Sequence, residues 1–295
     1  NNNIAIGKSA LSAEVGGQDN VAIGSNALAA QSSSSGNVYN VAIGKDAGAA
    51  VTTGVQNTIV GALAGDALTT GGQNVAIGYQ ALSTDDLGSH NVAIGANALS
   101  DMNFATAINS RNVAVGDQAG LRVTTGIRNV LIGGLSGDAL TDADDNVAIG
   151  TVALSSDTLG SNSVAVGHQA LATQNFTTAT DVYNVAMGYN AGVSVTTGIN
   201  NTFIGGLSGD ALTNAGRNTA LGFATLGTDT LGNRSTAVGY AALTSQNFTT
   251  SADSNNTAVG YNAGAATTTG VFNALIGSEA GDALTDADNN VALGY

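Results

Sequence analysis

The chain has 295 residues and a formal net charge of −14, with only seven Lys plus Arg, and it contains no Cys and no Pro. A nucleic-acid partner needs a basic surface for its phosphates, so this charge argues against one. The lack of Cys excludes a disulfide framework and a thiolate zinc site, and a hydrophobic content of 43% argues against disorder. No apolar run reaches the roughly 18 residues of a membrane span, so none is predicted in this segment.

One pentapeptide, Asn-Val-Ala-Ile-Gly with small variations, recurs along the whole chain. Residues 74–78 and 91–95 are two identical copies of it. The 17 closing glycines are Gly7, Gly24, Gly44, Gly61, Gly78, Gly95, Gly116, Gly133, Gly150, Gly167, Gly188, Gly205, Gly222, Gly239, Gly260, Gly277 and Gly294. A fixed period of this kind predicts a solenoid, in which each coil packs only on its neighbours.

The spacing of these glycines contains a second, longer period. From Gly44 onward the interval is 17 three times and 21 once, and this pattern makes a four-coil super-repeat with a period of 72, as from Gly44 to Gly116. The chain therefore divides into two leading coils (1–39), three four-coil units (40–111, 112–183 and 184–255) and a partial unit (256–295). We expect the array to continue beyond both ends. Seventeen coils at a strand spacing of about 4.8 Å predict a rod on the order of 80 Å long.

The motif itself reads as a short strand, because side chains alternate between two faces. The fourth position is always a large aliphatic residue, such as Ile43 or Met187, and we expect it to face the core. The third position is then expected to lie outside. It is Ala in most copies and large at Ile59, Leu131, Phe203 and Leu275. The closing Gly predicts a turn with positive φ, and the segment after it, x-x-Ala-Leu or x-x-Ala-Gly, predicts a second short strand or a turn.

Asn opens 15 of the 17 motifs, and Ser163 and Ser235 open the other two. Asn tolerates left-handed backbone and bonds nearby backbone groups. Stacked once per coil, these side chains are expected to form a ladder of amides that bond the coils above and below. The expected role is therefore structural, with ligand binding as the alternative.

The repeated Asn-Val-Ala-Ile-Gly-x-x-Ala, with its variant Ser-Val-Ala-Val-Gly at 163–167, resembles the head repeats of YadA-like trimeric autotransporter adhesins and related phage tail-fibre repeats. The resemblance covers essentially the whole chain. It implies a left-handed parallel β-roll, a homotrimer, and a place outside the cell, at a cell surface or on a virion. The coils of this chain are longer than is typical of that family, so no binding residue is carried over.

Acidic loops are the candidate metal sites. Gly133 to Leu140 is similar to the calcium-binding nonapeptide, but it recurs only once in each four-coil unit, whereas calcium rolls need it in consecutive turns. The Asp of its Gly-Asp-Ala-Leu segment, found at Asp66, Asp138, Asp210 and Asp282, is expected to bond backbone N–H groups. Asp142, Asp144 and Asp145, with Asp286 and Asp288, form loops whose counterpart in another unit contains Arg217, which indicates a variable solvated loop. No metal or cofactor is predicted.

Catalysis has little support in the sequence. His90 and His168 occupy unrelated coil positions, and the adjacent pair Asp85-Asp86 points to opposite sides of the chain. No nucleophile elbow or phosphate loop is present. Tyr residues after closing glycines, such as Tyr189 and Tyr240, are candidates for stacking on sugars, with scattered surface Tyr as the simpler interpretation.

The sequence therefore predicts an adhesive fibre segment rather than an enzyme. Its partners are expected to be two further copies of itself, joined along the third-position Ala face with Phe203 and its equivalents interdigitating, and a cell-surface glycan or protein receptor. Two alternatives stay open: a polysaccharide-degrading tailspike-type enzyme on a β-helix, and a calcium-stiffened extracellular filament.

Overall fold

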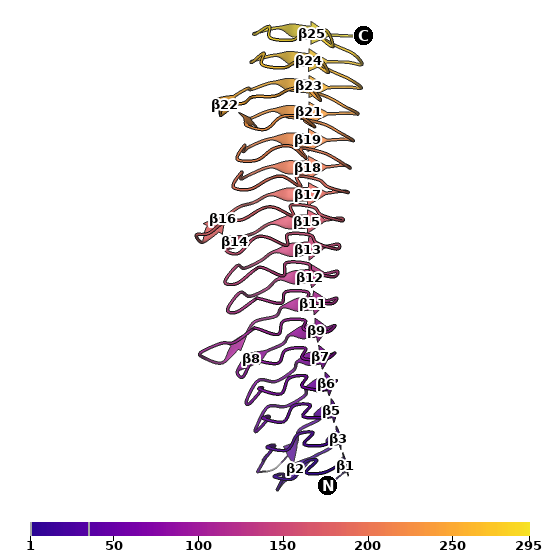
Figure 1. The fold of residues 1–295 in the computed structure, drawn as a ribbon, viewed down its shortest axis with the longest axis vertical. Coiled ribbons are helices and arrows are strands. Elements are labelled where there is room, and N and C mark those ends of the chain that lie inside the picture. The colour runs from indigo at the N-terminus through magenta and orange to yellow at the C-terminus, as the bar shows by residue number, and fades with distance from the viewer. Residues whose placement is uncertain (1, 35) are drawn as a thin grey trace. The chain divides into compact units, whose positions relative to one another are not determined.

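The computed structural model describes residues 2–34 and 36–295, and every regular element in that part of the chain is a β-strand. The chain forms two compact units, Asn1–Asn146 and Val147–Tyr295. Within each unit the coils stack in chain order and their strands lie side by side (Figure 1). The predicted all-β fold, a parallel β-solenoid with one coil per motif, is confirmed in both units.

Each motif forms one three-residue strand. The first unit contains β1 (Ile4–Ile6), β3 (Val21–Ile23), β5 (Val41–Ile43), β6 (Thr58–Val60), β7 (Val75–Ile77), β9 (Val92–Ile94), β11 (Val113–Val115) and β12 (Val130–Ile132). The second contains β13 (Val147–Ile149), β15 (Val164–Val166), β17 (Val185–Met187), β18 (Thr202–Ile204), β19 (Thr219–Leu221), β21 (Thr236–Val238), β23 (Thr257–Val259), β24 (Ala274–Ile276) and β25 (Val291–Leu293).

Neighbouring motif strands are parallel and in register. Ala76 of β7 lies opposite Ala93 of β9, although a full coil of chain separates the two, and Ala93 lies opposite Ala114 of β11 across the longer coil. The extra residues of long coils are therefore absorbed outside the motif strands. As a result, every motif position forms a column of equivalent side chains along each unit.

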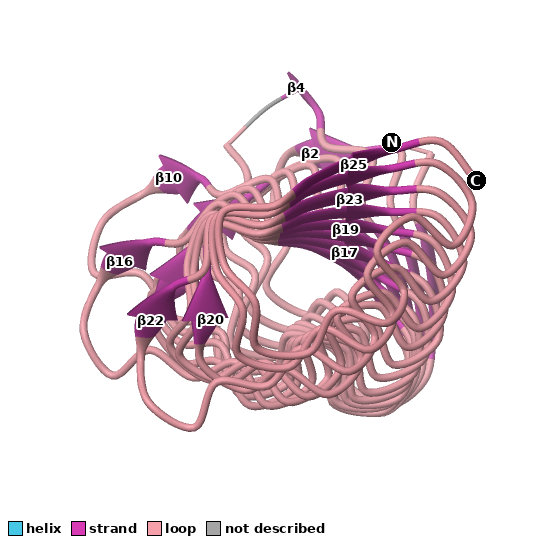
Figure 2. Ribbon diagram, turned by 90° about the horizontal axis from the view of Figure 1, so that it is seen from above, coloured by secondary structure: helices cyan, strands magenta, loops and turns pink. Residues whose placement is uncertain are grey.

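Among the described residues, a second strand occurs only in each long coil and in the 17-residue coil that precedes it. There, two-residue strands pair as β2 (Gly17–Gln18) with β4 (Gly36–Asn37), β8 (Gly88–Ser89) with β10 (Ile108–Asn109), β14 (Gly160–Ser161) with β16 (Thr180–Asp181), and β20 (Gly232–Asn233) with β22 (Ala252–Asp253). Figure 2 shows β10, β16 and β22 projecting from the stacked coils. The x-x-Ala segment after each motif forms turns, which is one of the two predicted alternatives.

The expected orientation of the motif strand was wrong. Its third position is fully buried in every strand between the two terminal ones, and this includes the large residues Ile59, Leu131, Phe203 and Leu275. The second and fourth positions are half-buried or exposed; Met187, for example, is 42% exposed. The Ala column faces the interior of the solenoid because a coil this narrow has room for small side chains there. The aliphatic columns face outward.

Large third-position residues fit because glycine replaces leucine beside them. Half of the coils have a Leu with a left-handed backbone at this place after the motif, such as the buried Leu82, and the other half have a Gly. Around Leu131 that residue is Gly120 in one coil and Gly137 in the next, and a Cβ on either would lie 2.7 Å from a Leu131 methyl group. Gly192 and Gly209 flank Phe203 in the same way. The four large residues are therefore core side chains matched to local space, not external knobs.

The predicted Asn ladder is confirmed. The Oδ1 of Asn57 accepts a hydrogen bond from the backbone N–H of Asn74 in the next coil (3.0 Å), and its Nδ2 donates to the carbonyl of Gly71 across its own coil (3.0 Å). Asn74 repeats this pattern toward Asn91 and Gly88. Each buried amide thus joins two coils and also spans the interior, where water cannot satisfy these backbone groups. The left-handed backbone falls on the residue before each Asn, such as Gln56.

The closing glycines have positive φ, as predicted, with values such as 137° at Gly78. They also pack against one another. A Cβ on Gly78 would lie 2.4 Å from the carbonyl oxygen of Gly95 in the next coil, which no side chain can tolerate. Glycine is required here both for the turn and for the close approach of successive coils.

Candidate interaction face

The outer side of the motif strands is the most distinctive surface of each unit. We call it the apolar face: the second-position Val, Ile, Thr or Ala and the fourth-position Ile, Val, Leu or Met of the motif strands. Ile43 is 39% exposed, Leu221 43% and Ile276 43%, so these side chains are open to solvent in the single chain. Eight strands of three residues span an area on the order of 400 Å² in the first unit alone, at about 4.8 Å per strand and 3.3 Å per residue.

Two columns of side chains border this face. The N-side column is the residue before each motif: Asn2, Asp19, Tyr39, Gln56, Gln73, His90, Arg111, Arg128 and Asp145 in the first unit, and Asn162, Tyr183, Asn200, Arg217, Arg234, Asn255, Phe272 and Asn289 in the second. The C-side column is the residue after each closing Gly: Lys8, Ser25, Lys45, Ala62, Tyr79, Ala96, Asp117 and Gly134, then Thr151, His168, Tyr189, Gly206, Phe223, Tyr240, Tyr261, Ser278 and Tyr295.

The N-side and C-side columns contain residue types that are rare elsewhere in the chain. Two columns of 17 positions make up 34 of the 295 residues, yet they contain all seven Tyr, both His and six of the seven Lys plus Arg. Arg122 is the exception. Tyr and Arg are the residues most enriched at protein interfaces, because they combine apolar contact area with hydrogen-bonding groups. The sequence interpretation of scattered surface Tyr missed this pattern, which appears once every coil is aligned on its strand.

Aromatic rings in the C-side column stack on one another. Phe223 and Tyr240 have ring centroids 5.7 Å apart, Tyr240 and Tyr261 5.5 Å, and His168 and Tyr189 5.6 Å, with nearly parallel planes. The faces between neighbouring rings are therefore covered, because a centroid spacing of this size is direct stacking contact. A sugar ring has no room between these faces, so stacking of sugars along the column is disfavoured, while the ring edges and hydroxyl groups stay available.

Two of the arginines in the N-side column bind an aspartate on the following coil. Arg128 donates from Nε and Nη2 to the two carboxylate oxygens of Asp145, each at 2.6 Å, and Arg234 forms an ion pair with Asp253 at 2.7 Å. The hydrogen bonds from Arg128 hold the pKa of the Asp145 carboxyl below its usual range. Arg111 and Asp117 form no ion pair with any residue in the described ranges 2–34 and 36–295.

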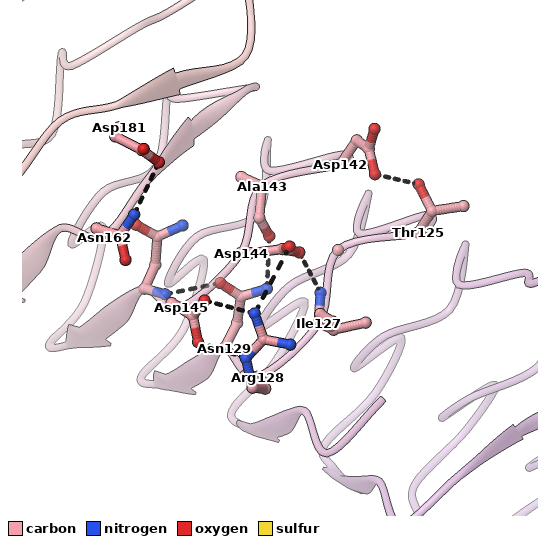
Figure 3. Close-up of polar contacts among 12 residues, drawn as sticks. Thr125, Ile127, Arg128, Asn129, Asp142, Ala143, Asp144, Asp145, Asn162 and Asp181 are labelled. Atoms are coloured by element: carbon pink, nitrogen blue, oxygen red, sulfur yellow. Dashed lines mark hydrogen bonds and ion pairs between the residues drawn. The ribbon is translucent and has the colours of Figure 1, made fainter. Parts of the chain in front are cut away.

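The acidic loop of residues 142–145 is held by separate partners (Figure 3). Asp142 accepts a hydrogen bond from the hydroxyl of Thr125 at 2.5 Å, and Asp144 accepts one from the backbone N–H of Ile127 at 2.8 Å. Asp288 accepts the equivalent bond from Val271 at 2.8 Å. These carboxylates therefore tie one coil to the preceding one. Within the described residues, no three His, Cys, Asp or Glu side chains converge as a metal site would require.

The predicted bonding of the Gly-Asp-Ala-Leu Asp to backbone N–H groups is met only in part: the N–H of the same residue interacts with the carboxyl, while one carboxyl oxygen has no partner. The Oδ1 atoms of Asp66, Asp138 and Asp210 are buried and accept no hydrogen bond, so the expected bond from a backbone N–H does not form at this atom. Burial raises the pKa of the three carboxyls, and the N–H of the same residue opposes that shift. Three coils lie between successive copies of this segment, so the carboxyls do not approach one another.

Asp85, the first residue of the Asp85-Asp86 pair, is buried in the interior, where it stabilises its own turn. Its Oδ1 accepts a hydrogen bond from the N–H of Gly88 at 3.0 Å. In the equivalent coils, Asp157 and Asp229 accept a second bond at Oδ2 from Gln174 (2.6 Å) and Gln246 (2.5 Å). Met102 replaces that Gln beside Asp85, and the Asp85 Oδ2 is left without a partner. Burial raises the pKa of Asp85 to about 6.

This difference predicts a pH-dependent stability that one substitution removes. The folded pKa of Asp85 lies above the value of about 3.9 for an unfolded Asp, so its protonated form stabilises the fold at low pH, and that contribution is lost as pH rises through about 6. A shift of this size corresponds to about 3 kcal/mol at most.

Met102→Gln supplies the missing donor and should stabilise the chain more at pH 7.5 than at pH 5. Urea denaturation of both proteins at the two pH values checks this; an equal difference at both would contradict it.

In residues 2–34 and 36–295 there is no pocket, and no helix is long and apolar enough to cross a membrane. Comparison of the chain with protein-family models, with curated proteins and with solved structures found no match.

Proposed function

We propose that this chain is a structural and adhesive segment of an extracellular fibre, either a phage tail fibre or a bacterial surface adhesin, and that it works as a parallel homotrimer. The apolar face carries the proposal. The largest contiguous apolar patch on a typical monomer covers about 300–600 Å² and is often functional, and the apolar face of each unit is of this order. Exposed aliphatic rows bordered by Tyr and Arg have the composition of an interface core with a polar rim.

We propose that the trimer is joined through the apolar face and not through the third-position Ala column. The third-position Ala column is buried inside the solenoid, so it is not available to a partner. In the proposed trimer, the apolar faces of three copies of each unit surround an axis that runs along the stack of coils of that unit. A closed three-fold arrangement covers the face of every copy and leaves none exposed. The likeness of the motif to repeats of trimeric surface fibres supports the same assembly.

Receptor binding would then fall to the surfaces that point away from the axis. The projecting pairs β8 with β10, β14 with β16 and β20 with β22 differ in sequence from copy to copy, as in Ala105–Asn109 and Thr177–Asp181. Loops of this kind on a rigid scaffold are typical binding elements. We propose that they present the contacts for a cell-surface glycan or protein.

Native mass measurement with paired variants tests the assembly. The wild-type chain at micromolar concentration should have three times the monomer mass. Met187→Asp combined with Leu221→Asp places charges on the apolar face and should yield monomers, because buried unpaired carboxylates are strongly disfavoured. Thr177→Asp combined with Thr249→Asp adds the same charge to exposed positions on projecting loops and should leave the trimer intact. A wild-type monomer, or equal behaviour of the two double variants, would refute the proposal.

A further inference from the structure

We infer that the two border columns bind each other between copies of the chain, so that the N-side column of one copy pairs with the C-side column of the next, coil by coil. This inference rests on the proposed trimer and adds the specific contacts that align its copies. The partner is a second copy of this chain, and the clearest single contact is between Arg111 of one copy and Asp117 of the next.

Geometry brings the two columns together. They lie at opposite ends of each motif strand, six residues apart, which is roughly 20 Å of extended chain and prevents contact within one copy. When three copies turn their apolar faces toward one axis, the N-side border of each copy meets the C-side border of its neighbour. Rotation about an axis parallel to the stack does not move a coil along it, so residues of the same coil meet.

The side chains that would meet are complementary in charge and type. Arg111 meets Asp117, and Lys45, whose ammonium group also contacts Asp46 at 2.8 Å, meets Tyr39. Guanidinium and ammonium groups are attracted to carboxylates and to aromatic rings. No coil places two cations or two carboxylates in its two border positions, so no like-charge contact arises.

The ion pairs already formed within the chain favour pairing of residues of the same coil over pairing shifted by one coil. A shift in one direction would bring Arg128 to Asp117, but both Arg128 nitrogens that face Asp145 are already bonded to it at 2.6 Å. Arg111 and Asp117 are both exposed, and neither has an ion-pair partner among the described residues of its own chain. The neutral Gln118 amide donates one hydrogen bond to the Asp117 Oδ2 at 3.1 Å, which leaves the charge of that carboxylate uncompensated. The arrangement is similar to charged pairs that flank the apolar seam of a coiled coil and set its register.

Disulfide trapping tests the inference, and no native cysteine interferes because the chain has no Cys. A disulfide requires Cα atoms within about 7 Å, so Arg111→Cys combined with Asp117→Cys cannot close within one copy but should link copies into a covalent trimer. Arg111→Cys combined with Tyr79→Cys is the matched control, because Tyr79 lies in the same column two coils, or about 10 Å, away. Non-reducing electrophoresis after mild oxidation should show the covalent trimer for the first pair only.

A charge exchange provides a second readout. Asp117→Arg alone should raise the concentration at which the trimer half-dissociates on the order of tenfold, since three weak surface pairs are lost together. Adding Arg111→Asp should restore it. The inference is overturned if the cysteine pair 111/117 yields no more covalent trimer than the pair 111/79, or if the charge exchange does not restore the stability of the trimer. Either result leaves the proposed trimer itself standing. A wild-type monomer overturns the proposed assembly itself and this inference with it.

Discussion

Replacing Phe203 with alanine is expected to lower the free energy of unfolding by about 3–5 kcal/mol, the usual cost of emptying a fully buried aromatic site. Phe203 is 0% exposed, and its ring packs against Gly192 and Gly209 of two coils. Neither glycine has a side chain that could move into the space left by the ring. The cavity would therefore persist rather than collapse, which places the expected loss at the upper end of such substitutions.

Two further variants make this result specific to the inner face. Phe203→Leu should cost much less than Phe203→Ala, because Leu131 and Leu275 occupy the same position in other units. Ile149→Ala, in a half-buried outer position, should cost only about 1 kcal/mol in chains dissociated by the charged face variant, since little apolar area is lost. Urea denaturation measures all three. A loss for Ile149→Ala equal to that for Phe203→Ala would contradict the observed orientation of the strand.

Substituting Asn74 with alanine is expected to cost about 2–5 kcal/mol, although no apolar contact of any size is lost. The substitution leaves the backbone N–H of Asn91 and the carbonyl of Gly88 without the Asn74 side-chain atoms that bond them at 2.9 and 3.0 Å. Both groups lie in the interior, and each buried group left unpaired costs about 1–3 kcal/mol. The loss should be confined at first to the coils around Asn74, because solenoid coils are stabilised by their nearest neighbours.

The control for this prediction is Asn109→Ala, at an exposed position of β10, where a change within about 0.5 kcal/mol is expected. Denaturation midpoints compare the two variants, and hydrogen exchange should show faster exchange of the Asn91 amide in Asn74→Ala. If Asn74→Ala and Asn109→Ala unfold alike, the ladder contributes no more than a surface amide does.

The sequence by itself determined the repeating architecture of this protein. The intervals between glycines predict the number of coils and their order, and the in-register pairing of Ala76 with Ala93 confirms them. It also predicted the Asn ladder and the positive φ of the closing glycines. These features depend on local backbone chemistry and on the stacking of identical residues, and both can be inferred directly from a repeated motif.

Only the tertiary structure decided which side of the strand is inside. The alternation of side chains defines two faces of the strand but does not say which of them is buried. Residue size indicated the wrong face, because large aliphatic side chains usually form the core. A narrow coil reverses that preference, since Ala fits inside it and Ile does not. One internal signal indicates the true orientation: each large third-position residue, such as Phe203, occurs where the flanking Leu becomes Gly. The replacement of Leu by Gly compensates for a large third-position residue only because both side chains fill the same closed interior. That interior belongs to the folded coil and cannot be inferred from the strand alone.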